Sequence, residues 1–224
     1  TKDNIMKLTD GIFHKVFDEI SAEYPDIKAE HLIIDIGTAK LAAQPEQFDV
    51  IVAPNLYGDI LSDVASQLTG SVGLGVSSNI GDKFAMFEAI HGSAPRRAGQ
   101  NVANPSALIL ASVLMLIHLG QSDPAEKIHN AWLKTLEDGI HTYDIYKEEV
   151  SKQKVGTQEF AAAVIERLGK KPSSLHAVSY KNQEKKPLPF KRKKIQTNRS
   201  LVGVDFFVYS SDSLDAFVSK ITGK

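Results

Sequence analysis

Apolar side chains recur every three to four residues in several stretches of the chain, which is the spacing of helices with a buried face. Asn104-Pro105 predicts the start of one such helix, and Gly120 predicts its end. Thr157 is expected to cap the last helix of the series. The pattern therefore predicts helices at residues 5–24, 59–68, 105–120, 123–139 and 157–168.

Strands are expected where short apolar runs are rich in β-branched residues. Residues 31–36 and 50–53 have this composition and predict two buried strands. Asp35 would then end a strand, where its carboxylate can reach a cleft. Residues 37–45 suit a short helix or turn, and the glycine-rich residues 69–82 are expected to form a loop.

The last fifty residues differ in composition from the rest. Eight Lys and Arg residues lie between Lys181 and Arg199, together with two prolines, which is typical of a solvated linker. A nucleic-acid or membrane role for this basic run is the disfavoured alternative. Residues 201–209 then predict a strand and residues 212–221 a helix, together the opening unit of a further α/β domain.

Composition excludes several classes of function. Lys and Arg number 26 against 27 Asp and Glu, so the net charge of −1 argues against a globally basic nucleic-acid binder. The chain contains no Cys, which excludes disulfides and thiolate sites and is compatible with a reducing compartment. The most apolar stretch, residues 107–119, is shorter than the roughly 20 residues that cross a bilayer. We therefore expect neither a nucleic-acid nor a membrane partner.

Two carboxylates four residues apart form the first candidate site. Asp59 and Asp63 would share one face of a helix, where their repulsion is unfavourable unless a cation lies nearby. Such oxygen pairs suit Mg²⁺ or Mn²⁺, and Asp35 could complete the set. The spacing alone leaves the alternative open that Asp59 caps the helix and Asp63 is solvated.

The second candidate site is the segment from Glu88 to Gly99. Its small residues and proline allow a ligand to approach the backbone, and Arg96 and Arg97 offer planar groups suited to phosphate. His91 could stack on a nucleotide. Composition alone leaves a surface loop with a chance arginine pair equally open, and neither of the usual glycine-rich nucleotide motifs is present.

Four motifs occur in sequence order: KDNIMKLTDG from Lys2, NLYGDILSD from Asn55, NIG from Asn79 and FEAIHGSAP from Phe87. Together they resemble the β-decarboxylating dehydrogenases, the family of isocitrate and 3-isopropylmalate dehydrogenases. The resemblance covers about residues 1–170 and is greatest to the bacterial isocitrate-specific members. It implies the α/β fold of that family, in an incomplete form that lacks the N-terminal half.

The resemblance implies oxidative decarboxylation of isocitrate to 2-oxoglutarate and CO₂ in the intact protein. Asp59 and Asp63 match metal ligands for Mg²⁺ or Mn²⁺, and Asp35 matches the ligand and catalytic aspartate that the other subunit contributes. Lys2 matches a lysine that assists proton transfer in the partner's site, and Asn4 matches a nearby contact to the cofactor. A homodimer with shared active sites is therefore expected.

The resemblance also implies NADP as the cofactor. Relatives that use NAD tend to carry an acidic residue where Arg96 stands, whereas Arg96 and Arg97 favour a 2′-phosphate. Tyr143 and Lys147 match a Tyr and a basic residue of NADP-dependent members, with Lys147 in place of the more familiar Arg. The cofactor-binding residues implied are Asn4, Glu88, His91, Gly92, Ala94, Pro95, Arg96, Arg97, Asn104, Tyr143 and Lys147.

Domain organisation follows from the same resemblance. We expect residues 1–75 to be part of a small dimerising domain with the metal site, residues 76–175 part of a large cofactor domain, residues 176–200 a linker and residues 201–224 the start of a C-terminal extension. Because Thr1 opens the chain without the family's N-terminal half, we expect the fragment alone to be inactive. The location expected is cytoplasmic. The alternatives are a 3-isopropylmalate dehydrogenase or an inactive binding or dimerisation module.

Overall fold

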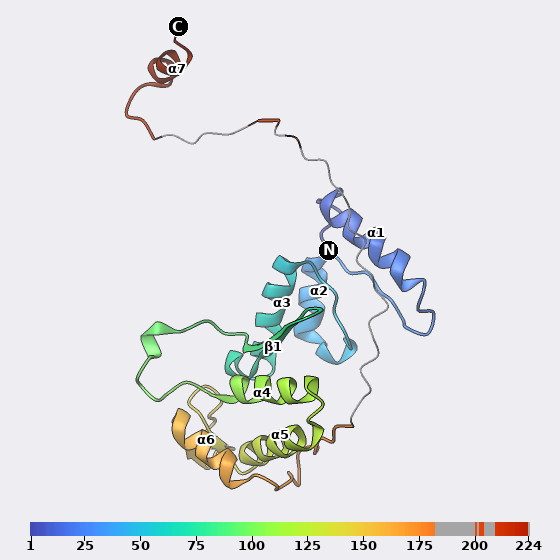
Figure 1. Ribbon diagram of the computed structural model, residues 1–224, viewed down its shortest axis with the longest axis vertical. Helices are drawn as coiled ribbons and strands as arrows, with labels where there is room; N and C mark the ends of the chain where they lie inside the picture. Colours follow the sequence, from blue (N-terminus) through green and yellow to red (C-terminus); the bar gives the residue numbers. More distant parts are fainter. Residues whose placement is uncertain (182–199, 201, 204–208, 224) are drawn as a thin grey trace. The chain divides into compact units, whose positions relative to one another are not determined.

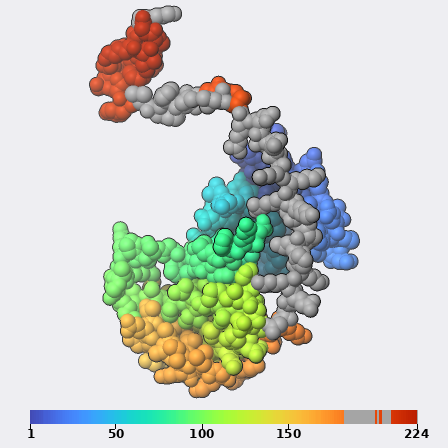
Figure 2. All heavy atoms as spheres, in the orientation of Figure 1, coloured from blue at the N-terminus to red at the C-terminus, as the bar shows by residue number. Residues whose placement is uncertain are grey.

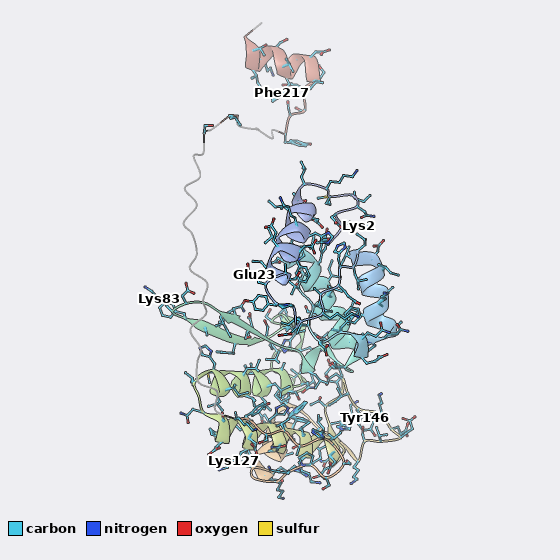
Figure 3. All side chains as sticks on the ribbon, turned by 90° about the vertical axis from the view of Figure 1, so that its right-hand side faces the viewer. Lys2, Glu23, Lys83, Lys127, Tyr146 and Phe217 are labelled. Carbon is cyan, nitrogen blue, oxygen red and sulfur yellow. The ribbon has the colours of Figure 1, made fainter. Side chains whose placement is uncertain are left out.

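The structure is a computed structural model that describes residues 1–181, 200, 202–203 and 209–223. Contacts along the chain divide it into two compact units, Thr1–Glu184 and Lys185–Lys224. The second unit contains the helix α7 (Leu214–Thr222), which carries Phe217 in Figure 3. The Ser213 hydroxyl accepts a hydrogen bond from the Ala216 N–H, as a helix cap does. This confirms the helix expected at residues 212–221, whereas the strand expected at residues 201–209 and the linker fall largely outside the described residues.

The first unit combines six longer helices with short strands, and Figure 1 shows their arrangement. Two short sheets occur among its described residues: β1 pairs antiparallel with β2, and β3 pairs parallel with β4. The elements in chain order are α1 (Thr9–Ser21), α2 (Ile34–Ala43), η1 (Pro45–Gln47), α3 (Asn55–Leu68), η2 (Val72–Leu74), β1 (Val76–Ile80), β2 (Ala85–Ala89), η3 (Pro95–Arg97), α4 (Ser106–His118), α5 (Ser122–Glu137), β3 (Ile140–His141), β4 (Gln153–Lys154) and α6 (Thr157–Glu166).

All the helices expected in this unit form, with shifted ends. α1 starts at Thr9, because residues 1–8 are held in turns by contacts of their own. α4 begins at Ser106, one residue later than expected, so Pro105 rather than Asn104 takes the N-cap position. The Asn104 side-chain oxygen still accepts a hydrogen bond from the Ser106 N–H at 2.9 Å. Thr157 is not a cap, since its hydroxyl donates instead to the Ala103 carbonyl oxygen. Gly139 ends α5 with φ of 76°, a left-handed conformation that favours glycine.

The two strands expected at residues 31–36 and 50–53 do not form. Ile34 begins α2, and residues 50–53 are irregular, with Val50 83% exposed. No described strand pairs with either run. A strand without a partner leaves its backbone N–H and C=O groups unsatisfied, so apolar composition alone does not stabilise it. Asp35 consequently lies in the first turn of α2 rather than at a strand end.

A β-hairpin forms where a loop was expected. β1 and β2 pair from Val76 opposite Ala89 to Ile80 opposite Ala85, and Figure 3 shows Lys83 at the tip of this hairpin. The hairpin packs against α4, the most apolar helix of the chain. No helix among the described residues has both the length and the apolar character needed to span a membrane.

The core of the unit lies where α4, α5 and α6 meet. It is built from Ala131 and Trp132 of α5 and Phe160 and Val164 of α6, all of them buried. The Trp132 indole N–H donates to the Ser106 hydroxyl at 2.8 Å, so the polar atom of this ring is satisfied within the core. β3, which lies between α5 and α6 in the sequence, packs against both helices, and Figure 1 shows α4, α5 and α6 grouped together.

Replacing Phe160 by Ala should lower the free energy of unfolding by about 3–5 kcal/mol, because the ring is fully buried and its removal leaves a cavity. Trp132 is the single tryptophan of the chain and contacts this core, so its fluorescence in a urea titration reports the change. Phe84→Ala is the matched control, since Phe84 is 84% exposed and its loss should change stability by less than about 0.5 kcal/mol. Equal losses in the two variants would contradict this view of the core.

Candidate functional site

Lys2 and Asp35 are brought together by the fold. The Lys2 ammonium donates a hydrogen bond to an Asp35 carboxylate oxygen at 2.9 Å, joining residues that lie 33 positions apart. This hydrogen bond lowers the pKa of Asp35 below its ordinary value. The Asp35 side chain remains 69% exposed, so its carboxylate is open to a further ligand. Lys2, labelled in Figure 3, and Asp35 therefore form an ion pair. These are the two residues that the resemblance assigns to the active site of a partner subunit.

Asp10 fixes the position of Lys2, and the sequence analysis did not single it out. Asp10 is buried in the first turn of α1, and one carboxylate oxygen accepts a hydrogen bond from the Lys2 backbone N–H at 2.6 Å. The Tyr57 hydroxyl of α3 also donates to this carboxylate. The bond from Lys2, and then that from Tyr57, lower the pKa of Asp10 against the effect of burial. In the sequence, Asp10 is distinguished only by its place in the motif that begins at Lys2.

Asp59 and Asp63 lie one turn apart on α3, and both are exposed. In the part of the chain that the structure describes, no ion pair or hydrogen bond links either carboxylate to Asp35. Nor do these three carboxylates form a compact group of ligands there. The negative charges of Asp59 and Asp63 repel each other, and neither has a cationic partner within salt-bridge range among the described residues. A hard divalent cation bound by both carboxylates would relieve this repulsion.

The segment that follows β2 is an exposed loop that presents its backbone to solvent. All residues from His91 to Gln100 are exposed, and Figure 2 shows this light-green segment standing out from the unit. Ala94 has φ of 42°, a left-handed conformation that is uncommon for a residue with a Cβ atom. This turn leads into η3, on which Arg96 and Arg97 lie side by side.

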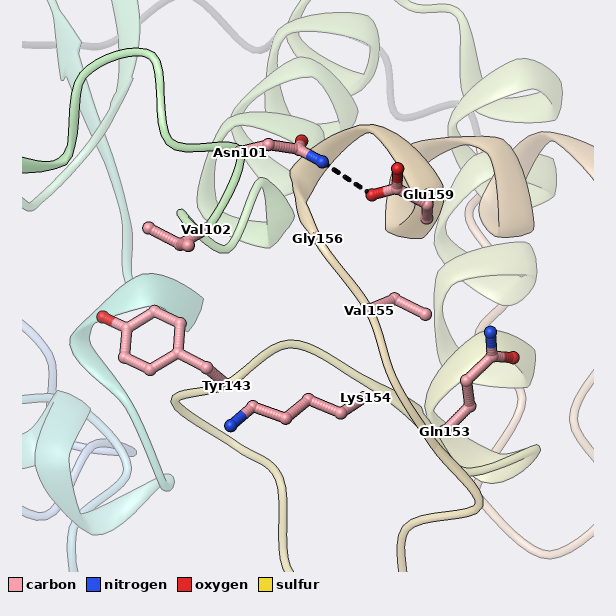
Figure 4. Close-up of a pocket in the computed structure, with 8 residues that line it drawn as sticks. All are labelled: Asn101, Val102, Tyr143, Gln153, Lys154, Val155, Gly156 and Glu159. Carbon is pink, nitrogen blue, oxygen red and sulfur yellow. Dashed lines mark hydrogen bonds between the residues drawn. The ribbon is translucent and has the colours of Figure 1, made fainter.

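Arg97 and Tyr143, far apart in the sequence, meet at this loop. The Arg97 guanidinium carbon lies 5.0 Å from the centre of the Tyr143 ring, within the range of a cation–π interaction. Tyr143 also lines a pocket of about 450 Å³, drawn in Figure 4, which is within the size range of small-molecule sites. The pocket is lined by Asn101, Val102, Tyr143, Gln153, Lys154, Val155, Gly156 and Glu159.

The pocket wall is held by contacts between its two sides. The Asn101 side-chain amide donates to a Glu159 carboxylate oxygen at 2.9 Å, as the dashed line in Figure 4 shows. A Cβ atom on Gly156 would come within 2.4 Å of the Asn101 carbonyl oxygen, so this close approach requires glycine. Lys154 adds a cationic side chain to the lining that the sequence analysis did not identify.

Asp144 is the second residue that the sequence analysis missed, although it follows Tyr143 directly. Its carboxylate accepts three hydrogen bonds, from the Ser71 hydroxyl at 2.5 Å, the Asn104 amide at 3.0 Å and the Thr142 hydroxyl at 2.6 Å. Burial by itself would raise the pKa of Asp144, but the three bonds outweigh it and the pKa is lowered. Asp144 thereby fixes the side chain of Asn104 through a hydrogen bond and the backbone next to Tyr143 through its own position. Both are predicted cofactor residues.

The remaining predicted residues are placed as follows. Glu88 of β2 accepts a hydrogen bond from the Asn79 amide of β1 at 3.0 Å, so it joins two of the recognised motifs across the hairpin. The His91 ring nitrogen Nδ1 lies 2.9 Å from the neighbouring Gly92 carbonyl oxygen. Lys147 is exposed and its backbone N–H donates to Ser151, while Asn4 is exposed near Lys2.

Comparison with known proteins now identifies the family. The family model described as isocitrate/isopropylmalate dehydrogenase matches residues 1–164. The chain belongs to this family. The match covers most of the first unit and includes Lys2, Asp35 and the pocket-lining residues, which confirms the family and the incomplete α/β fold expected from the motifs.

Curated members of the isocitrate/isopropylmalate dehydrogenase family show the extent of the similarity. An isocitrate dehydrogenase [NADP] of Rickettsia bellii is 59% identical over 210 residues, which are 93% of this chain and 44% of that protein. A 3-isopropylmalate dehydrogenase of Methanothermobacter thermautotrophicus is 46% identical over 167 residues, 75% of this chain and 49% of that protein. The chain thus spans less than half the length of these relatives.

A solved structure shows the same similarity and the same partial coverage. The crystal structure of the TT0538 protein from Thermus thermophilus matches with a TM-score of 0.75 and 45% sequence identity. The match covers 81% of this chain and 36% of the Thermus chain. Backbone and sequence similarity therefore agree on the family and on the partial coverage.

Replacing Asp144 by Asn should lower the free energy of unfolding by about 2 kcal/mol at pH 7, because an amide nitrogen would face one of three hydrogen-bond donors. A carboxyl group whose folded pKa is lowered stabilises fully above its unfolded pKa, near 3.8, and this contribution is lost as the pH falls through the folded value. The difference between wild type and variant should therefore shrink on acidification below about pH 4. Urea unfolding at a series of pH values measures it.

The matched control is Asp82→Asn, which replaces an exposed carboxylate in the hairpin turn. Its effect on the free energy of unfolding should stay below about 0.5 kcal/mol. A loss as large as that of Asp144→Asn, or a loss at Asp144 that does not depend on pH, would be inconsistent with the role given to its hydrogen bonds.

Proposed function

We propose that the chain carries the cofactor-binding and metal-binding residues of an NADP-dependent isocitrate dehydrogenase. In the intact enzyme, isocitrate would be oxidised and decarboxylated to 2-oxoglutarate and CO₂ while NADP⁺ accepts the hydride. The observation that carries the proposal is the Arg97–Tyr143 pair beside the pocket. The name isocitrate dehydrogenase [NADP] of the Rickettsia bellii relative, at 59% identity, supports it.

Recognition of NADP rests on the cationic groups around Tyr143. A 2′-phosphate distinguishes NADP from NAD, and planar guanidinium groups bind phosphate through paired hydrogen bonds. Arg97 already stacks on Tyr143, so less side-chain freedom is lost when a phosphate binds. Arg96, Lys147 and Lys154 would add positive charge close to the same position. Asn104, held by Asp144, would contact the adenine ring.

The proposal for NADP can be tested on the chain itself, with 2′,5′-ADP as a probe for the phosphate-bearing half of the cofactor and 5′-AMP as its counterpart without the 2′-phosphate. We expect isothermal titration to show tighter binding of 2′,5′-ADP. The double variant Arg96→Asp with Arg97→Ile should remove this preference, because a carboxylate repels the phosphate and the guanidinium pair is gone. A loss of at least about tenfold in 2′,5′-ADP affinity is expected.

Lys83→Ala serves as the control, because Lys83 carries the same charge at the hairpin tip and lies away from the pocket (Figure 3). Its affinity for 2′,5′-ADP should equal that of the wild type. The assignment of NADP fails if the Arg96/Arg97 variant keeps the preference, or if the wild type binds 5′-AMP equally well.

The metal-binding residues in the proposal are Asp59 and Asp63 of one subunit with Asp35 of the other. Their oxygen donors fit a hard cation, and both α3 carboxylates are exposed without an ion-pair partner among the described residues. Bound Mg²⁺ or Mn²⁺ would supply Lewis-acid polarisation of the substrate oxygens. Because Asp35 is not joined to Asp59 or Asp63 within this chain, a homodimer with shared sites is the arrangement we propose.

Lys2 and Asp35 would act together in the partner's site. The Asp35 carboxylate accepts a hydrogen bond from the Lys2 ammonium at 2.9 Å and so orients it, while Asp10 fixes the backbone of Lys2. Lys2 Nζ would hold or deliver the proton that the substrate gains after CO₂ is lost. Asn4, on the same segment, would contact the cofactor or substrate. The proposed division is residues 1–75 for the dimerising part and residues 76–175 for the cofactor part.

The main alternative is a 3-isopropylmalate dehydrogenase. The Methanothermobacter relative with that name is 46% identical over a shorter stretch of the chain, compared with 59% for the isocitrate dehydrogenase of Rickettsia bellii. The adjacent Arg96 and Arg97 favour NADP and hence the isocitrate assignment. An inactive binding module, the cytoplasmic location and the C-terminal extension remain predictions from the sequence.

Activity can be tested in a chimera in which this chain replaces the matching 210 residues of the Rickettsia bellii enzyme. We expect reduction of NADP⁺ with isocitrate and Mg²⁺, and at least about 100-fold slower turnover with 3-isopropylmalate. Asp59→Asn in the chimera should lower Mg²⁺-dependent turnover by at least about 100-fold, because one anionic ligand is lost.

Asp82→Asn in the same chimera is the control and should leave turnover unchanged, since Asp82 lies in the hairpin turn. Faster turnover of 3-isopropylmalate would favour the alternative enzyme. Near-normal activity of the Asp59→Asn chimera would exclude the metal role of Asp59.

A further inference from the structure

A second group of metal-ligating side chains lies beside α1, apart from the three aspartates discussed above. Asp3, His14 and His31 each offer one ligand atom, and these atoms all lie within 4.8 Å of one another. The His14 ring nitrogen Nδ1 is 2.8 Å from one Asp3 carboxylate oxygen, and the His31 nitrogen Nε2 is 3.4 Å from the other. The two imidazole rings are stacked, with centres 3.6 Å apart.

These distances are close to those around a bound transition-metal ion. Zn²⁺ binds imidazole nitrogen and carboxylate oxygen at about 2.0–2.2 Å, which places neighbouring ligand atoms about 3.3 Å apart in a tetrahedral site. Because the two rings are stacked, one imidazole would have to rotate out of the stack so that both nitrogens point at one ion. Three protein ligands also leave a fourth position, which water can take.

The surroundings of the group suit a metal site as well. The other nitrogen of His14, Nε2, is 3.5 Å from an Asp18 carboxylate oxygen, an arrangement that orients a ligating imidazole. The Thr1 hydroxyl lies 2.7 Å from His31 Nε2 and donates to Asp3, so a metal would replace these contacts.

An ion can reach the group from solvent. His14 and His31 line a pocket of about 640 Å³, and the side chains of Asp3, His14 and His31 are 19%, 27% and 28% exposed. Nitrogen donors separate this site from the proposed Mg²⁺ site, whose donors are all oxygens. We propose that Asp3, His14 and His31 bind one Zn²⁺ ion, which ties the residues before α1 to α1 and to the residues before α2.

The test uses the full chain freed of metal with EDTA. Isothermal titration with ZnCl₂ in the presence of millimolar Mg²⁺, which occupies oxygen-only sites, should show one tight site. The double variant His14→Gln with His31→Gln should bind Zn²⁺ at least about 100-fold more weakly. Zn²⁺ should also raise the melting temperature of the wild type and not that of the variant, because the ion binds the folded state. Circular dichroism checks that the variant is folded.

His176→Gln is the matched control, since His176 is exposed and is not part of the group. Its Zn²⁺ affinity should equal that of the wild type. Cobalt replacement gives a readout that needs no variant: wild type with one Co²⁺ should show the intense visible absorption of a four-coordinate site. The proposal is overturned if this absorption is absent, if wild type and double variant bind Zn²⁺ equally, or if His176→Gln weakens binding as much.

Discussion

The candidate cofactor site depends on one half-buried carboxylate. Asp144 accepts hydrogen bonds from Ser71, Asn104 and Thr142, which come from three separate parts of the chain. An ionised carboxylate in a half-buried position is stable only if hydrogen bonds satisfy its oxygen atoms. The three hydrogen bonds therefore fix the positions of the donor side chains as well as that of Asp144. Because Tyr143 adjoins Asp144, this network also sets where the Arg97–Tyr143 pair lies beside the pocket.

The helices of the first unit could be predicted because their signals are local. Asn104-Pro105 directly precedes α4, Gly139 ends α5, and apolar spacing marks the faces that meet around Trp132 and Phe160. Membership of the family could also be recognised, since its motifs are contiguous runs of residues. Of the candidate site, the sequence identified Arg97 and Tyr143 separately, and the structure then brought them within 5.0 Å.

Features that depend on distant partners could not be predicted. Residues 31–36 and 50–53 have strand composition, but no described strand pairs with them, whereas polar residues 76–80 form β1 because β2 satisfies their backbone groups. Asp10 and Asp144 were missed for a related reason. A carboxylate that positions another residue differs from a surface aspartate only in its donors, and these lie elsewhere in the chain.

The pocket in Figure 4 has a consequence for the order in which the protein is made. One side comes from Asn101 and Val102, whereas the other comes from residues 143–159. The Asn104 side chain can accept its hydrogen bond from Ser106 as soon as α4 forms. Its second hydrogen-bond partner, Asp144, is synthesised 40 residues later. During synthesis, helices α1 to α4 can therefore assemble before both sides of this pocket exist. The pocket is complete only when the start of α6 has emerged, so a molecule that binds there could not assist the earlier folding steps.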